Sequence, residues 1–81
     1  MSDDDIRRAV TEALGAIAPE VDFATLNERA PLRDQVDLDS MDWLRFLAAL
    51  EKKLSVQIPD AAARKLFTLR DVLNYLAAAP A

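Results

Sequence analysis

The residues from Leu38 to Asp42 have the types and the spacing most suited to chemistry in this sequence. Ser40 stands between Asp39 and Asp42, just ahead of a long segment rich in apolar residues. The aspartate at position 39 is favoured as an N-cap residue, because its carboxylate can accept hydrogen bonds from the unpaired backbone N–H groups of a helix's first turn. Ser40 is then either a plain first-turn residue or an exposed hydroxyl that carries a covalent group.

The residue inventory excludes most catalytic chemistry. The chain contains no histidine and no cysteine, so it cannot assemble a serine–histidine pair, a thiolate nucleophile or a disulfide. Its single glycine, Gly15, excludes a glycine-rich phosphate loop. We therefore expect a protein that is not an enzyme and has no metal site.

Charge and hydropathy limit the partners and the location. The net charge of −4 argues against nucleic acid and favours basic protein surfaces as partners. No apolar run approaches the roughly 20 residues that span a bilayer. The acidic N-terminal residues, MSDDD, lack the basic-then-apolar order of a secretory signal. We expect a cytoplasmic, freestanding monomer without a membrane span.

The elements that must position Ser40 follow from apolar periodicity and capping residues. With 81 residues, 52% of them hydrophobic and 30% charged, the chain fits one globular domain over residues 1–81. Ser2 and Thr68 are expected N-caps, the latter in a capping box with Asp71, and Asp60 is a candidate cap. Helices are expected over about residues 3–17, 40–54, 60–67 and 69–78. Residues 18–38 read as a long loop, with a helical turn near residues 23–28. The predicted fold is all-α, a small four-helix bundle with three longer helices, one short helix and a long first loop.

The helix over residues 40–54 carries two apolar stripes. One is a core stripe, which consists of Trp43, Phe46, Leu47, Leu50 and Leu54. Met41, Leu44 and Ala48 form a second stripe beside Ser40. The long loop folds over this second stripe, or the stripe is a docking patch for a partner; both hold if the loop covers only part of it.

Several motifs together resemble the acyl carrier proteins, a phosphopantetheine-binding family. Asp39-Ser40-Met41-Asp42 is similar to the family's Asp-Ser-Leu-Asp. It is followed in order by a helix, then by Val56-Gln57-Ile58-Pro59-Asp60 and Thr68-Leu69-Arg70-Asp71-Val72. The resemblance covers about residues 32–76, and it is the combination that makes it specific.

The resemblance implies that Ser40 carries 4′-phosphopantetheine, transferred from coenzyme A by a phosphopantetheinyl transferase, with Asp39 as the flanking motif residue. Acyl or aminoacyl groups are then held as thioesters for fatty-acid, polyketide or related specialised biosynthesis. The implied partners are acyl-transferring or acyl-ligating enzymes with basic docking surfaces. By position, their contacts fall on Asp39, Met41, Asp42, Leu44 and Ala48. The family also shelters acyl chains between helices, for which Phe46, Leu50, Leu73 and Leu76 are candidates; plain core packing is the favoured alternative for each of them.

The sequence departs from the family pattern at several positions. Asp37 stands where a glycine is common, and Trp43 is larger than usual. Arg45, Lys52 and Lys53 occupy a helix that often carries glutamates. These differences favour a specialised carrier over the housekeeping fatty-acid carrier. Two alternatives remain, a non-carrying helical interaction module with Ser40 as a helix start and a signalling module phosphorylated at Ser40.

Overall fold

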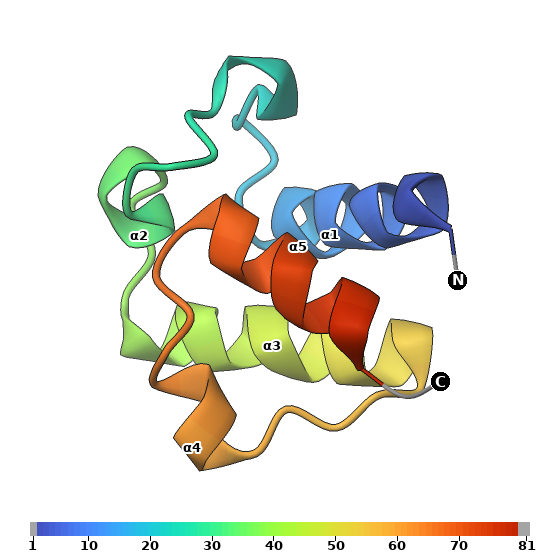
Figure 1. Cartoon of the computed structure of the whole chain (residues 1–81). Helices are drawn as coiled ribbons and strands as arrows, with labels where there is room; N and C mark the ends of the chain where they lie inside the picture. Colours follow the sequence, from blue (N-terminus) through green and yellow to red (C-terminus); the bar gives the residue numbers. More distant parts are fainter. Residues whose placement is uncertain (1, 80–81) are drawn as a thin grey trace.

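The computed structural model describes residues 2–79 as an all-α bundle (Figure 1). Its elements, in chain order, are α1 (Asp3–Ile17), the 3-10 helix η1 (Phe23–Thr25), α2 (Leu32–Gln35), α3 (Ser40–Leu54), α4 (Asp60–Ala63) and α5 (Leu69–Ala78). Within residues 2–79 no strand forms, and the sole strand-like contact is an isolated bridge between Pro31 and Thr68. The predicted fold class is confirmed, and the three longer helices have the predicted bounds.

Capping explains why the three long helices begin where they do. Ser2, Asp39 and Thr68 are the N-caps of α1, α3 and α5, and each forms a reciprocal capping box with an aspartate three residues later. Each box satisfies two backbone N–H groups that a helix start leaves without partners. The predicted caps at Ser2 and Thr68 are confirmed.

The short helix was predicted too long. α4 ends at Ala63 instead of Phe67, and Asp60 is its first residue, since Pro59 takes the N-cap position and no side chain caps the helix. The backbone of Phe67 is used elsewhere: its N–H donates to Asp71 and its carbonyl accepts from Leu32. These bonds cannot coexist with a helix that continues through residue 67.

The long connection between α1 and α3 contains more helix than expected. The turn predicted near residues 23–28 is shorter, the 3-10 helix η1, and a further four-residue helix, α2, was not predicted. Leu32 of α2 is fully buried and Val36 nearly so. Tertiary burial therefore stabilises a helical turn too short for periodicity to reveal.

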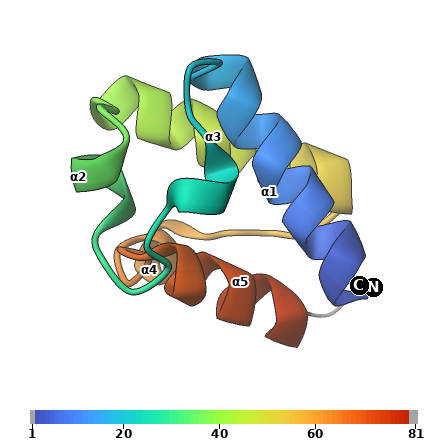
Figure 2. The ribbon, with the colours of Figure 1, turned by 90° about the horizontal axis from the view of Figure 1, so that it is seen from above.

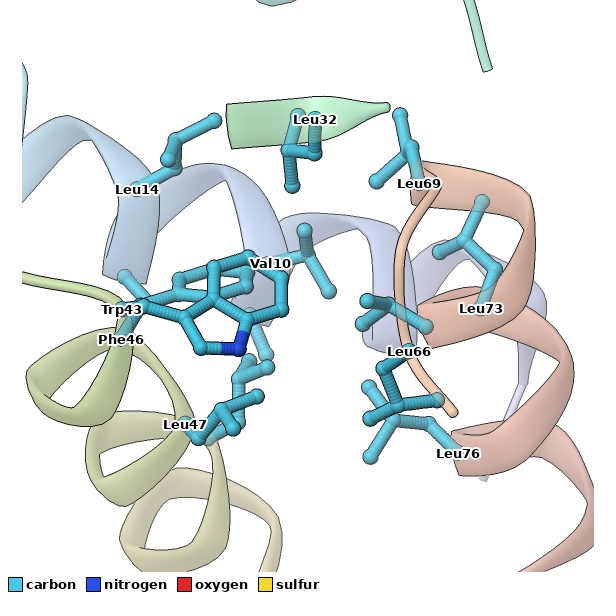
Figure 3. Close-up of a cluster of buried hydrophobic side chains, with 14 of the residues drawn as sticks. Val10, Leu14, Leu32, Trp43, Phe46, Leu47, Leu66, Leu69, Leu73 and Leu76 are labelled. Carbon is cyan, nitrogen blue, oxygen red and sulfur yellow. The ribbon is translucent and has the colours of Figure 1, made fainter. Parts of the chain in front are cut away.

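The core lies between α1, α3 and α5, which pack around a common centre (Figures 1 and 2). Figure 3 shows Val10 and Leu14 of α1 facing Phe46 of α3, with Leu73 of α5 on the far side. Four predicted core residues of α3 are buried, but Leu54 is only half-buried. A rigid core thus fixes α3, the helix that begins at Ser40.

Hydrogen bonds hold the long connection against the start of α5. The Arg70 backbone N–H donates to the Glu28 carbonyl over 2.9 Å, and the Leu32 N–H donates to the Phe67 carbonyl over 2.8 Å. The guanidinium groups of Arg70 and Arg7 both reach Oε1 of Glu28, at 2.8 and 3.2 Å. These contacts hold α2 and the residues before it next to the start of α5.

Candidate functional site

The candidate site begins with the hydrogen bonds around Ser40. Oδ1 of Asp39 accepts the Asp42 N–H over 2.8 Å, and Oδ2 of Asp42 accepts the Asp39 N–H over 3.4 Å. The N-cap interpretation of Asp39 is therefore confirmed. The two aspartates make the capping bonds, so the Ser40 side chain takes no part in them and is exposed to solvent. It lies at the positive end of a 15-residue helix, where an anionic group is stabilised.

The segment that leads into Ser40 is anchored. Leu38 and Val36 are buried, and Nε of Arg33 donates to the Leu38 carbonyl over 3.3 Å. Among residues 2–79, the one non-glycine residue with positive φ is Ser55. Asp37 thus adopts a backbone conformation open to any residue, and no glycine is needed there.

A groove opens beside the start of α3. It has a volume of about 620 Å³ and runs between α2, α3 and the segment from α4 to Phe67. Its lining residues are Pro31, Arg33, Asp34, Leu38, Trp43, Leu44, Leu47, Asp60, Ala63, Arg64, Leu66 and Phe67. Because Ser40, Leu44 and Leu47 follow at i, i+4 and i+7, Ser40 lies on the groove side of α3. A group attached to Ser40 therefore starts at the edge of a largely apolar groove.

Trp43 forms part of the groove wall and also closes the core. Its ring centroid lies 5.4 Å from that of Phe46, with the planes tilted by 38°. Trp43 is 9% exposed, whereas Phe46 is fully buried. Figure 3 shows the two side chains beside each other. The tryptophan thus separates the groove from the packed interior.

The four residues first considered for sheltering an acyl chain do not line this groove. Phe46, Leu50, Leu73 and Leu76 are all buried in the core. Plain core packing accounts for this burial, because the four lie in one apolar cluster. Their role in sheltering an acyl chain between the helices stays a prediction. The groove residues that sequence reasoning missed are Leu66 and Phe67, which follow α4 in a turn that periodicity did not resolve.

The second apolar stripe of α3 is open to solution. Met41 is 59% exposed and Leu44 56% exposed, and Ala48 is also exposed. The interpretation that the long loop covers this stripe is wrong, because the loop packs against α5 instead. Phe67, at 63% exposure, adds a third large apolar side chain, across the groove from Leu44. Exposed apolar groups this close to one another are typical of interaction surfaces.

Within residues 2–79, none of the helices is both long enough and apolar enough to cross a membrane. The acidic side chains of this part of the chain form no group of three or more that could hold a metal ion.

Comparison with known proteins identifies the class. Residues 4–76 match the family described as "Phosphopantetheine attachment site". The chain is also similar to proteins named acyl carrier protein from three Campylobacter species, each over 73 residues that cover 90% of this chain and 88% of the relative. The identity is 36% for Campylobacter curvus, 34% for Campylobacter lari and 33% for Campylobacter jejuni. The chain belongs to the acyl carrier protein family. The cofactor of this family is covalently bound 4′-phosphopantetheine, and its members are carriers, not catalysts.

Proposed function

We propose that Ser40 is the attachment point of 4′-phosphopantetheine and that residues 1–81 form one carrier domain. One observation supports this most directly. The Ser40 hydroxyl is exposed at the capped start of α3, beside an apolar groove, and the aspartates around it leave it unengaged. Within a family that binds phosphopantetheine covalently, this is the geometry that attachment requires.

The residues around Ser40 fit a phosphodiester-linked group. The helix N-terminus stabilises the phosphate charge, while the carboxylates of Asp39 and Asp42 oppose it in part. When bound, the arm supplies the terminal thiol that this cysteine-free chain lacks, and acyl or aminoacyl groups form thioesters with it. Trp43, Leu47 and Leu66 present an apolar wall next to the attachment point, which reduces the exposure of an acyl group to water.

The chain depends on other proteins for its chemistry. It has no histidine, so we assign activation of the Ser40 hydroxyl to a phosphopantetheinyl transferase. The carboxylates near Ser40 steer basic docking surfaces of this transferase and of acyl-transferring or acyl-ligating enzymes. Asp39, Met41, Asp42, Leu44 and Ala48 form the proposed contact surface. We place this function in the cytoplasm, in a monomer that serves fatty-acid, polyketide or related specialised biosynthesis.

Intact mass spectrometry tests the attachment. The chain is incubated with coenzyme A, magnesium and a broad-specificity phosphopantetheinyl transferase, beside the variants Ser40→Ala and Ser55→Gly. The second variant is the matched control, because Ser55 is exposed and its left-handed conformation (φ 53°) suits glycine. We expect one phosphopantetheinyl group on the wild type and on Ser55→Gly, and none on Ser40→Ala.

Other outcomes point to the alternatives. No mass gain on a folded wild-type chain at high transferase concentration would favour a non-carrying helical interaction module. A gain that persists in Ser40→Ala would move the attachment point elsewhere. Phosphate alone on Ser40 in protein purified from cells would favour the signalling alternative.

A further inference from the structure

The acidic and the basic side chains of α3 differ in what they contact. Each acidic side chain at its start or near its end is engaged by backbone: Asp39 and Asp42 form the capping box, and Oε2 of Glu51 accepts the Ile58 N–H over 3.1 Å.

The basic side chains of α3 are used differently. The salt bridges within residues 2–79 are Arg7–Glu28, Arg70–Glu28 and Lys53–Glu12. Lys53 thus pairs with α1, whereas Arg45 and Lys52 take part in none of these bridges. Both are exposed. Beyond the first turn, the exposed charges of α3 that take part in none of these salt bridges are therefore positive.

Helical spacing places these charges among the exposed apolar residues. Met41, Arg45, Ala48 and Lys52 follow at i, i+4, i+7 and i+11, so they share one line along α3, with Leu44 beside it. All five are exposed. A partner that covers Met41 and Leu44 therefore also removes Arg45 from water. A buried charge is costly unless it is paired, so that partner needs an acidic group at this place.

We infer that the outward line of α3 (Met41, Leu44, Arg45, Ala48 and Lys52) docks on an enzyme surface that is apolar at its centre and acidic opposite Arg45 and Lys52. A carrier must dock on enzymes, so this partner surface rests on the proposed function. Near Ser40 the exposed Asp37 and Asp39 favour basic groups on the partner. The sign of the charge changes along the helix, which fixes the direction in which the partner lies on α3.

This distribution of charge along α3 discriminates between possible partner enzymes. A docking surface that is basic throughout meets Arg45 and Lys52 as like charges, which lowers affinity and slows association. The two basic residues lie seven positions apart, about 10 Å along the helix axis. The complementary acidic groups on the partner are expected at a similar separation.

A charge-swap experiment tests the inference without requiring the arm. All variants carry Ser40→Ala, so binding is measured with no transfer. The probe is a phosphopantetheinyl transferase whose carrier-binding surface is basic, together with a version in which two of those basic residues are changed to Glu. The Kd of each is measured for the parent, for Arg45→Glu/Lys52→Glu and for the control Arg8→Glu/Arg29→Glu. The control residues are exposed and in none of the salt bridges above, and its net charge is the same as that of the test variant.

We expect the two transferases to prefer opposite charges at positions 45 and 52. At low salt we expect the basic transferase to bind Arg45→Glu/Lys52→Glu roughly five-fold or more tightly than the control. The acid-substituted transferase should instead bind the parent more tightly than Arg45→Glu/Lys52→Glu. Both differences shrink at about 0.5 M salt. Equal affinities of the test and control variants would overturn the inference, as would an unchanged preference of the acid-substituted transferase. Circular dichroism of each variant verifies the fold. The arm-loading measurement on the Ser40 chain tests the proposed function separately.

Discussion

Asp39 and Asp42 each accept the backbone N–H of the other, so one reciprocal pair of hydrogen bonds encloses Ser40. The shorter bond, 2.8 Å, runs from the Asp42 N–H to Asp39. This pair gives the two aspartates a structural role that is independent of any partner. It fixes the first turn of α3 and keeps the Ser40 hydroxyl outside the capping network.

Replacing Asp39 separates its capping role from its charge. Asp39→Ala removes the cap, so we expect the free energy of unfolding to fall by about 1 kcal/mol. Asp39→Asn keeps a capping oxygen without the charge, so it should remain close to the wild type in stability. Chemical denaturation of both variants measures the difference. If the two variants lose equal stability, the charge of Asp39 matters to the fold and the cap alone does not explain it.

Met41 and Leu44 are predicted to matter for docking and not for folding. At 59% and 56% exposure, their replacement by Glu should change the free energy of unfolding by no more than about 0.5 kcal/mol. Arm loading at Ser40 or transfer to a partner enzyme should slow, because the apolar surface is lost. Initial rates of loading by mass spectrometry, beside the melting curve, provide the measurement. An Asn74→Glu variant, exposed on α5, is the control. Unfolded Glu variants would show that the stripe is core and refute the docking role.

The sequence predicted the long elements because their signals are local and repeated. The bounds of α1, α3 and α5 follow from apolar periodicity together with capping residues at Ser2, Asp39 and Thr68, and all three caps occur. The exposed Ser40 at the start of a helix followed from the same signals.

What the sequence could not show depends on contacts between distant segments. α2 is only four residues long, and it is stabilised by the burial of Leu32 and by a bond from its N–H to the Phe67 carbonyl. The predicted continuation of α4 through residue 67 is excluded by the backbone of Phe67, which bonds to Leu32 and Asp71. The groove was missed for the same reason, because it lies between segments that meet only in the folded chain.

Glu28 is predicted to hold the long connection in place. Its carboxylate meets both Arg7 and Arg70, and with side-chain exposures of 33–44% these pairs are screened by water. Glu28→Ala should therefore cost only about 0.5–1.5 kcal/mol of unfolding free energy. Amide hydrogen exchange should rise around residues 26–35 more than in α1 or α3. Glu12→Ala, which breaks the more exposed pair with Lys53, is the control and should cost less. Unchanged exchange would show that the backbone bond between Arg70 and Glu28 suffices.

Asp71 should make part of the stability depend on acid pH. Backbone hydrogen bonds from Thr68 and Phe67, each 3.0 Å long, lower the pKa of Asp71 from 3.8. The folded state thus binds this proton less readily than the unfolded state. The contribution of Asp71 is complete above the unfolded pKa, near 3.8, and is lost as the pH falls through the lower folded value.

Comparing Asp71→Asn with the wild type isolates this contribution. The variant should be less stable than the wild type by a constant amount between about pH 5 and 8, since the carboxylate is ionised throughout that range. Below about pH 4 the difference should shrink, because the wild type alone loses an ionised acceptor. Thermal melting in a series of buffers measures it, with Asp37→Asn as the control for the loss of an exposed carboxylate. A difference that stays constant down to pH 2 would mean that the carboxylate charge does not stabilise the start of α5.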